Sequence, residues 1–126
     1  MSRIRGKDTR PELLVRRLIH SLGYRYRLHL KDLPGRPDLV FGKRRAVIMV
    51  HGCFWHGHRD PACKLARLPK TRLEFWVPKI EATRVRDERN RQDLAKLGWR
   101  VLELWECQLA DRERLVETIK GHLGEP

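Results

Sequence analysis

The chain has 126 residues, of which 40% are hydrophobic, and its formal net charge is +12. This length is typical of one domain with a core of its own. Such an excess of positive charge indicates a polyanionic partner, most simply nucleic acid, although a solubilising surface is the alternative. No stretch approaches the roughly 18 apolar residues of a membrane span, and the charged N-terminus lacks the apolar region of a signal peptide. We therefore expect an intracellular protein with no membrane partner.

The start of the chain is predicted to be a basic arm followed by an amphipathic helix. Residues 1–8 form the arm. Thr9 fits the N-cap of a helix, and Glu12 lies three positions later, as in a capping box. Leucines then recur at every fourth position from Leu14 to Leu22, and Gly23 is typical of a helix end.

Three strands are predicted next, joined as an antiparallel meander. Residues 24–30 alternate between apolar and polar side chains, as a strand with one buried face does. Asp38 opens a short apolar strand over residues 39–41, and residues 42–45 turn the chain. The apolar run of residues 46–50 is typical of a buried central strand.

The second half of the chain is predicted to add a parallel strand and two helices. Pro78 is tolerated in the first turn of a helix, and residues 79–97 are charged and helical. A strand over residues 99–105 then lies parallel to the central strand, because a crossover helix joins them. Asp111 caps a final amphipathic helix. The sequence therefore predicts a single α/β domain over residues 1–126, with a central mixed sheet flanked by helices.

Cysteine and histidine residues cluster directly after the central strand, where open α/β sheets bind their ligands. The total of three cysteines is odd, so complete disulfide pairing is impossible and metal binding is the better explanation. Four residues are candidate ligands of a structural, tetrahedral Zn²⁺ ion: Cys53, His58, Cys63 and Cys107. His51 or His56 could replace His58, and the alternative to a metal site is three free thiols with surface histidines.

A second metal site is predicted around Asp38. It opens a strand next to the central one, so it should lie near Val50 and His51. A carboxylate there suits Mg²⁺, which prefers oxygen ligands, and Glu12 could add a second carboxylate. The alternatives are that Asp38 only shapes a turn and that Glu12 only completes its capping box.

His56 lies between the two predicted metal sites. Because imidazole changes protonation near neutral pH, His56 is a candidate general base. Phe54, Trp55 and Trp76 lie in polar, basic segments without helical or strand periodicity. Such aromatic side chains can insert between bases or stack on them, or they can form a small core around the zinc.

Five motifs cover nearly the whole chain: PGRPD (34–38), VHGCFWHGH (50–58), EFW (74–76), GWRVL (98–102) and WEC (105–107). Together they resemble the very short patch repair endonucleases, the Vsr family. The resemblance implies a restriction-endonuclease-like α/β fold and a monomeric enzyme of the bacterial cytoplasm, associated with the nucleoid. It further implies nicking of double-stranded DNA 5′ to the thymine of a T:G mismatch, with mismatch-repair proteins as partners.

The resemblance also implies which residues hold metals. Asp38 and the main-chain carbonyl of Val50 would bind the catalytic Mg²⁺, and Glu12 would hold metal-bound water. The structural Zn²⁺ would be bound by Cys53, His58, Cys63 and Cys107. Position 50 is usually Thr in the family, and a carbonyl ligand is unaffected by this difference.

The remaining roles concern the reaction and the DNA. The resemblance implies that His56 activates the attacking water, that Asp87 orients His56, and that His51 assists at the phosphate. Phe54, Trp55 and Trp76 would intercalate beside the mismatch. Two further residues would lie near the DNA: Lys79, which keeps its family identity, and Thr83, where relatives commonly carry Asn. The alternatives are a zinc-stabilised DNA-binding module without catalysis and a nickase with a different lesion or sequence preference.

Overall fold

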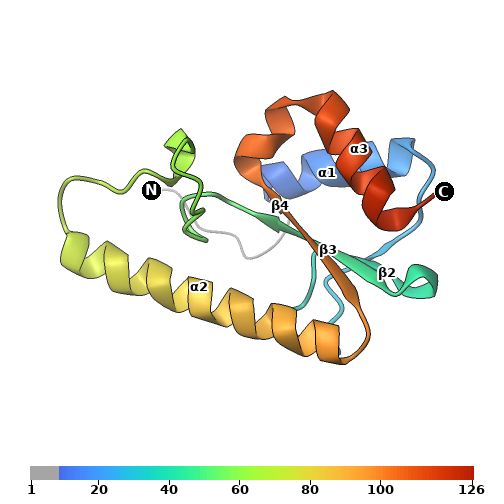
Figure 1. Cartoon of the computed structure of the whole chain (residues 1–126), viewed down its shortest axis with the longest axis horizontal. Coiled ribbons are helices and arrows are strands. Elements are labelled where there is room, and N and C mark those ends of the chain that lie inside the picture. The colour runs from blue at the N-terminus through green and yellow to red at the C-terminus, as the bar shows by residue number, and fades with distance from the viewer. Residues whose placement is uncertain (1–8) are drawn as a thin grey trace.

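The computed structural model describes residues 9–126, so the predicted basic arm of residues 1–8 lies outside the described part. Three α-helices and four strands follow one another in the order shown in Figure 1. They are α1 (Arg10–Ser21), β1 (Arg27–Leu28), β2 (Leu39–Phe41), β3 (Ala46–His51), α2 (Leu73–Lys96), β4 (Arg100–Trp105) and α3 (Arg112–Leu123). Short 3₁₀ turns span Gly42–Arg44, Lys64–Ala66 and Glu106–Ala110.

The four strands form one mixed sheet in the order β1-β2-β3-β4. β2 is antiparallel to β1 and to β3, as the predicted meander requires. β4 is parallel to β3, with Val50 opposite Leu104 and His51 opposite Trp105. Because the two strands are parallel, the segments that follow them leave the sheet at the same edge. The α/β class and the mixed sheet are thus confirmed.

Helices cover both faces of the sheet. α1 and α3 lie together on one face, and α2 runs along the other (Figure 1). All six residues of β3 are buried. Because side chains alternate along a strand, Ile48 packs with Ile19 and Ile119 in the larger core, while Val47 packs with Leu94 of α2 in the smaller one.

The ends of the helices follow the sequence signals closely. Thr9 caps α1, and its hydroxyl accepts a hydrogen bond from the Glu12 N–H at 3.3 Å. Asp111 caps α3 and accepts from the Arg114 N–H at 3.2 Å. The carboxylate of Glu12 also forms ion pairs, with Arg16 and with His29 of the next segment.

Two elements differ from the prediction. β1 has only two residues, because only Arg27 and Leu28 find partners on the short strand β2. α2 begins at Leu73 rather than after Pro78, so the proline lies inside the helix. The ring of Trp76 in this early part of α2 packs against Phe54 at a centroid distance of 5.1 Å. This contact holds the helix start that the proline alone would disfavour.

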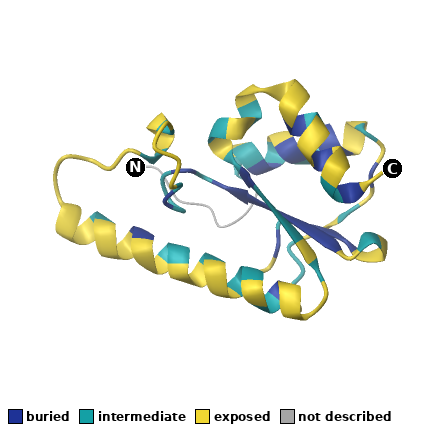
Figure 2. Cartoon of the chain, viewed as in Figure 1, coloured by how far each residue is buried: buried dark blue, intermediate teal, exposed yellow. Residues whose placement is uncertain are grey.

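Helix α2 is long and mostly exposed. It has 24 residues, of which only Ile80 and Leu94 are buried, and Figure 2 shows it largely in the colour of exposed residues. None of the helices within residues 9–126 combines the length and apolar character needed to cross a bilayer.

Candidate active site and metal centre

The segment after β3 turns sharply against α2 and brings its histidines and cysteines together. Gly57 has φ of +61° at this turn. A Cβ atom there would lie 2.5 Å from both Arg84 and Ile80, so only glycine fits. The Arg84 Nε–H donates to the carbonyl of Gly57 at 2.8 Å. The turn between His56 and His58 is thus fixed on α2.

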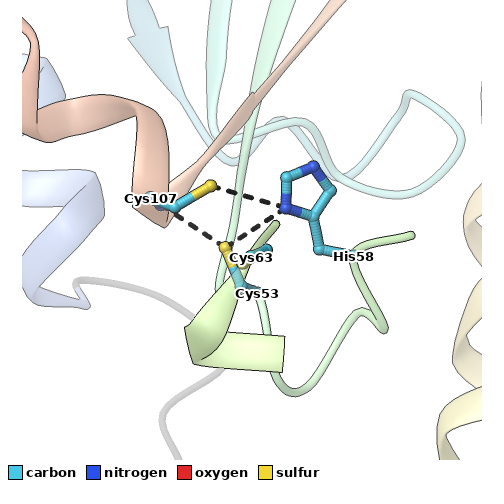
Figure 3. A group of neighbouring side chains, drawn as sticks. All are labelled: Cys53, His58, Cys63 and Cys107. Atoms are coloured by element: carbon cyan, nitrogen blue, oxygen red, sulfur yellow. Dashed lines mark hydrogen bonds between the residues drawn. The ribbon is translucent and has the colours of Figure 1, made fainter. Parts of the chain in front are cut away.

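Three cysteines and one histidine meet at the edge of the sheet where β3 and β4 end (Figure 3). The Nδ1 atom of His58 lies 3.6 Å from the Cys53 sulfur and 3.5 Å from the Cys107 sulfur. Cys63 completes a group whose ligand atoms all lie within 4.8 Å of one another. The predicted set of four residues therefore gathers in space, with Cys107 reaching it from the segment after β4.

This group has the chemistry of a structural zinc site. Tetrahedral zinc with Zn–S near 2.3 Å and Zn–N near 2.0–2.1 Å separates sulfur and nitrogen ligands by about 3.6 Å. Burial raises the pKa of Cys53 to about 12 and also raises that of Cys107. Of the three thiols only that of Cys53 is buried, and neighbouring thiols resist ionising together unless a cation lies between them, so the donor set suits a bound metal ion.

Trp105, the last residue of β4, separates this centre from a second group of histidines. The His58 ring stacks on the Trp105 ring at 4.2 Å with an angle of 9°. His51 lies on Trp105 at 4.9 Å. His51 and His56 belong to a different group, with Asp87, and so do not take the place of His58 among the cysteines.

An acidic group made of buried Glu12 and half-buried Asp38 lies at the start of β2. Asp38 immediately precedes the strand, and its Oδ2 accepts a hydrogen bond from the Val50 N–H at 2.7 Å. Glu12 is almost completely buried, and its Oε2 lies 2.7 Å from Nε2 of His29. The same His29 nitrogen lies 3.7 Å from Oδ1 of Asp38. The sequence prediction that Glu12 and Asp38 lie together is therefore confirmed.

Electrostatics in this acidic group favour a bound cation. Burial, the largest cause, and the nearby Glu12 carboxyl together raise the pKa of Asp38 to about 7, against the opposing hydrogen bond from Val50. Each carboxylate makes it harder for the other to ionise, which a divalent cation would reverse. The oxygen-rich donor set fits Mg²⁺.

Two histidine–carboxylate pairs lie beside the acidic group. Nδ1 of His56 lies 2.6 Å from Oδ2 of Asp87 on α2. Nε2 of His51 lies 2.8 Å from Oε2 of Glu103 on β4. The two imidazole rings face each other at 4.1 Å. The pairing of His56 with Asp87 leaves Nε2 of His56 as the nitrogen that can take up a proton.

An open cavity of about 530 Å³ borders His56 on the side of α2. Its lining includes His56, Asp87, Arg91, Glu103 and Trp105. Solvent and a substrate can therefore reach the His56 side of the site.

The aromatic side chains form a cluster at the start of α2. Phe54 lies 5.0 Å from Trp55 and 5.1 Å from Trp76, and the two tryptophans lie 5.6 Å apart. None of the three is fully buried. Farther along α2, Lys79 is exposed and the Thr83 hydroxyl donates to the Lys79 carbonyl at 3.2 Å.

Three residues near the site were not expected from the sequence. His29 was expected only as a polar position of a strand, and its φ of +47° gave no signal in the sequence. Glu103 is the only acidic residue of β4, and this isolated charge in an apolar strand could have indicated a buried partner. Trp105 was predicted as part of a buried strand, without its contacts to both groups of histidines.

Comparison with known proteins identifies the relatives of this chain. The family model "DNA mismatch endonuclease Vsr" matches residues 1–62. A type II nicking enzyme of Xanthomonas oryzae, V.XorIIP, is 59% identical over 123 residues, covering 98% of this chain and 88% of that protein. The DNA mismatch endonuclease Vsr of Escherichia coli is 44% identical over 117 residues, covering 93% of this chain and 73% of that protein. The chain therefore belongs to the Vsr family of DNA endonucleases.

Proposed function

We propose that this endonuclease nicks one DNA strand 5′ to the thymine of a T:G mismatch and that the reaction depends on Mg²⁺. The observation that carries the proposal is the meeting of two functional groups at one end of the sheet. The buried carboxylate of Glu12 and the half-buried one of Asp38 both lie near His29, and the charge of His56, which is already paired with Asp87, acts on Asp38. This combination suits hydrolysis of a phosphodiester by an activated water. The Escherichia coli relative is itself named a mismatch endonuclease.

Asp38 is the proposed protein ligand of the metal, with the main-chain carbonyl of Val50. The hydrogen bond from the Val50 N–H ties the Asp38 carboxylate to the end of β3, and Glu12 is placed to hold water around the cation. When bound, Mg²⁺ supplies Lewis-acid stabilisation of the charge that develops on the phosphate. Nε2 of His29 lies near both carboxylates and borders the same proposed metal site.

His56 is the proposed general base. Its Nδ1–H donates to Asp87, so the ring is held in one orientation and Nε2 accepts the proton of the attacking water. His51 lies against the same ring and is proposed to assist at the phosphate. The proton then rests on His56, where the Asp87 carboxylate stabilises the imidazolium.

The proposed DNA surface lies on the same side as the cavity. The loop between the cysteine centre and α2 carries exposed basic residues suited to phosphate contacts: Arg59, Lys64, Lys70 and Arg72. Phe54, Trp55 and Trp76 are proposed to insert at the mismatch, and Lys79 and Thr83 to lie beside it. Mismatched steps unstack at lower cost than paired steps, so insertion of aromatic rings favours them.

A nicking assay tests this function. Duplexes that differ only in one T:G or T:A pair are incubated with the zinc-loaded protein, with and without Mg²⁺. We expect a nick only 5′ to the mismatched thymine and only with Mg²⁺. His56→Ala should retain zinc and duplex affinity while losing about 10²–10⁴-fold in single-turnover rate, as expected for a lost general base. His20→Ala, at an exposed position on α1, is the control.

Three results would contradict the proposal. Equal nicking of T:G and T:A duplexes would make the enzyme a nickase with another preference. Full activity without Mg²⁺ would remove the metal role of Asp38. A His56→Ala protein that nicks at the parent rate would assign the base to another group.

Replacement of a single aromatic residue separates recognition from chemistry. Trp76→Ala should reduce the ratio of T:G to T:A nicking, because the ring no longer fills the unstacked step. Leu97→Ala, an exposed apolar residue at the far end of α2, is the control for lost apolar surface. If Trp76→Ala keeps the parent ratio, the aromatic cluster serves only to pack the start of α2.

A further inference from the structure

Glu103, the carboxylate of the second histidine–carboxylate pair, has no role in the function proposed above. Glu103 lies in the middle of β4, a strand whose other side chains except Arg100 are apolar. Its side chain is 17% exposed, and both of its oxygens are used. Oε2 lies 2.8 Å from Nε2 of His51, and Oε1 accepts a hydrogen bond from Nη1 of Arg91 at 2.5 Å. A carboxylate in such a place is stable only with partners.

We propose that Glu103 is a positioning residue of the nuclease site, which fixes the His51 imidazole through Nε2 and is itself held by Arg91 of α2. This inference rests on the proposed function, because it gives His51 a fixed place beside the proposed base. His51 sits at the end of β3 directly after Val50, and its ring lies 4.1 Å from the ring of His56. A rotation of the His51 ring would therefore disturb both imidazoles.

Charge supports the same arrangement. Burial alone would raise the pKa of Glu103, but the hydrogen bond and charge of His51, together with the Arg91 guanidinium, lower it below its ordinary value. Glu103 is therefore an anion at neutral pH and accepts from the His51 Nε2–H. Outer carboxylates that orient functional imidazoles in this way fix both the ring plane and the nitrogen that carries the proton.

One face of α2 controls both histidines. Asp87 and Arg91 are four residues apart on the helix and therefore project from the same side. Asp87 contacts His56 directly, and Arg91 acts on His51 through Glu103. Arg91 also pairs with Glu88 one turn earlier, which limits the freedom of its side chain. The simplest competing explanation is that Arg91 and Glu103 only join α2 to β4.

The test compares four variants of the full, zinc-loaded chain. Glu103→Leu removes the acceptor at similar volume, and Glu103→Gln keeps a carbonyl oxygen for the Nε2–H. Arg91→Met removes the guanidinium that holds Glu103. Glu117→Gln, at an exposed position of α3, is the control. Each variant is measured for T:G duplex affinity, for single-turnover nicking with Mg²⁺, and for the ¹⁵N signals of its histidines, with His51→Asn used to assign the His51 signals.

We expect Glu103→Leu to lose about 10–100-fold in nicking rate while its duplex affinity stays within about threefold of the parent, as for other outer partners of functional histidines. Glu103→Gln should recover most of the rate. In the parent, the His51 signals should show a protonated, hydrogen-bonded Nε2, and these signals should change in Glu103→Leu and in Arg91→Met but not in Glu117→Gln.

The proposal is overturned if Glu103→Leu nicks at the parent rate, or if its rate falls while the His51 signals stay unchanged. Loss of stability without either effect would support the purely structural explanation. If the parent protein does not nick T:G duplexes at all, the proposed function fails. The His51 signals of the variants then still decide whether Glu103 positions the ring.

Discussion

At the scale of single residues, the ionised carboxylate of Asp38 destabilises the folded protein. Asp38 is a half-buried acid beside Glu12, and its pKa of about 7 is far above the ordinary value of 3.8. A group with a raised folded-state pKa contributes stability that is complete below its unfolded pKa and lost as the pH rises through the folded pKa. In the absence of a cation, ionised Asp38 therefore lowers the free energy of unfolding at and above neutral pH.

Asp38→Asn should consequently stabilise the magnesium-free protein while abolishing nicking. The amide keeps an oxygen for the Val50 N–H but carries no charge. Between about pH 5 and pH 8 the stability difference from the parent should grow to about 2–4 kcal/mol, in favour of the variant. Denaturant unfolding at several pH values measures it, with the exposed Asp32→Asn as control. A stability difference that does not change with pH would show that the charge of Asp38 does not destabilise the fold.

At the scale of elements, the metal-ligand set of the segment after β3 is completed by a residue that follows β4. Cys53, His58 and Cys63 belong to this segment, whereas Cys107 follows β4. A metal ion held by all four would tie the histidines of the site to the sheet. The site loop would then lose its shape when the metal is removed, even though its own sequence is unchanged.

Cys107→Ser tests this dependence. We expect a loss of bound zinc and a fall in melting temperature of more than about 10 °C, because zinc-site binding energies contribute directly to folding. Metal analysis and thermal unfolding measure both effects. His58→Asn should behave in the same way, whereas His20→Asn on α1 should behave like the parent. Carefully purified parent protein that contains no zinc would contradict the assignment.

The elements differ in how far the sequence predicts them. Thr9 and Asp111 are local signals, and both caps are confirmed. The apolar run of β3 and the crossover rule gave the parallel partner β4. The start of α2 at Leu73 could not be predicted from Pro78, and the contact of Trp76 with Phe54 in this part of the helix joins residues far apart in the sequence. Likewise, the contact of Glu103 with His51 joins residues on neighbouring strands, and periodicity carries no information about such contacts.

At the scale of the whole molecule, the charge of the chain suits a DNA partner. The net charge is +12, and α2 presents most of its length to solvent (Figure 2). This excess of positive charge offsets the repulsion between the carboxylates of the site and an approaching phosphate.

Duplex affinity should fall steeply with salt. If about six phosphates are contacted, the logarithm of the association constant plotted against the logarithm of salt concentration should have a slope near −5. Fluorescence anisotropy with a labelled T:G duplex gives this slope, and a T:A duplex of the same length should give a similar one. A slope shallower than about −2 would mean that most of the charge serves solubility.

The position of Cys107 after β4 has a consequence for the synthesis of this enzyme. A growing chain presents both carboxylates of the acidic group, both imidazoles and three metal ligands before α2 and β4 have been made. The parallel partner of β3 and the fourth ligand are made only after α2. We expect an unfinished chain to contain the site residues without holding them in their folded arrangement. Chromosomal DNA would then meet an assembled site only in the completed enzyme.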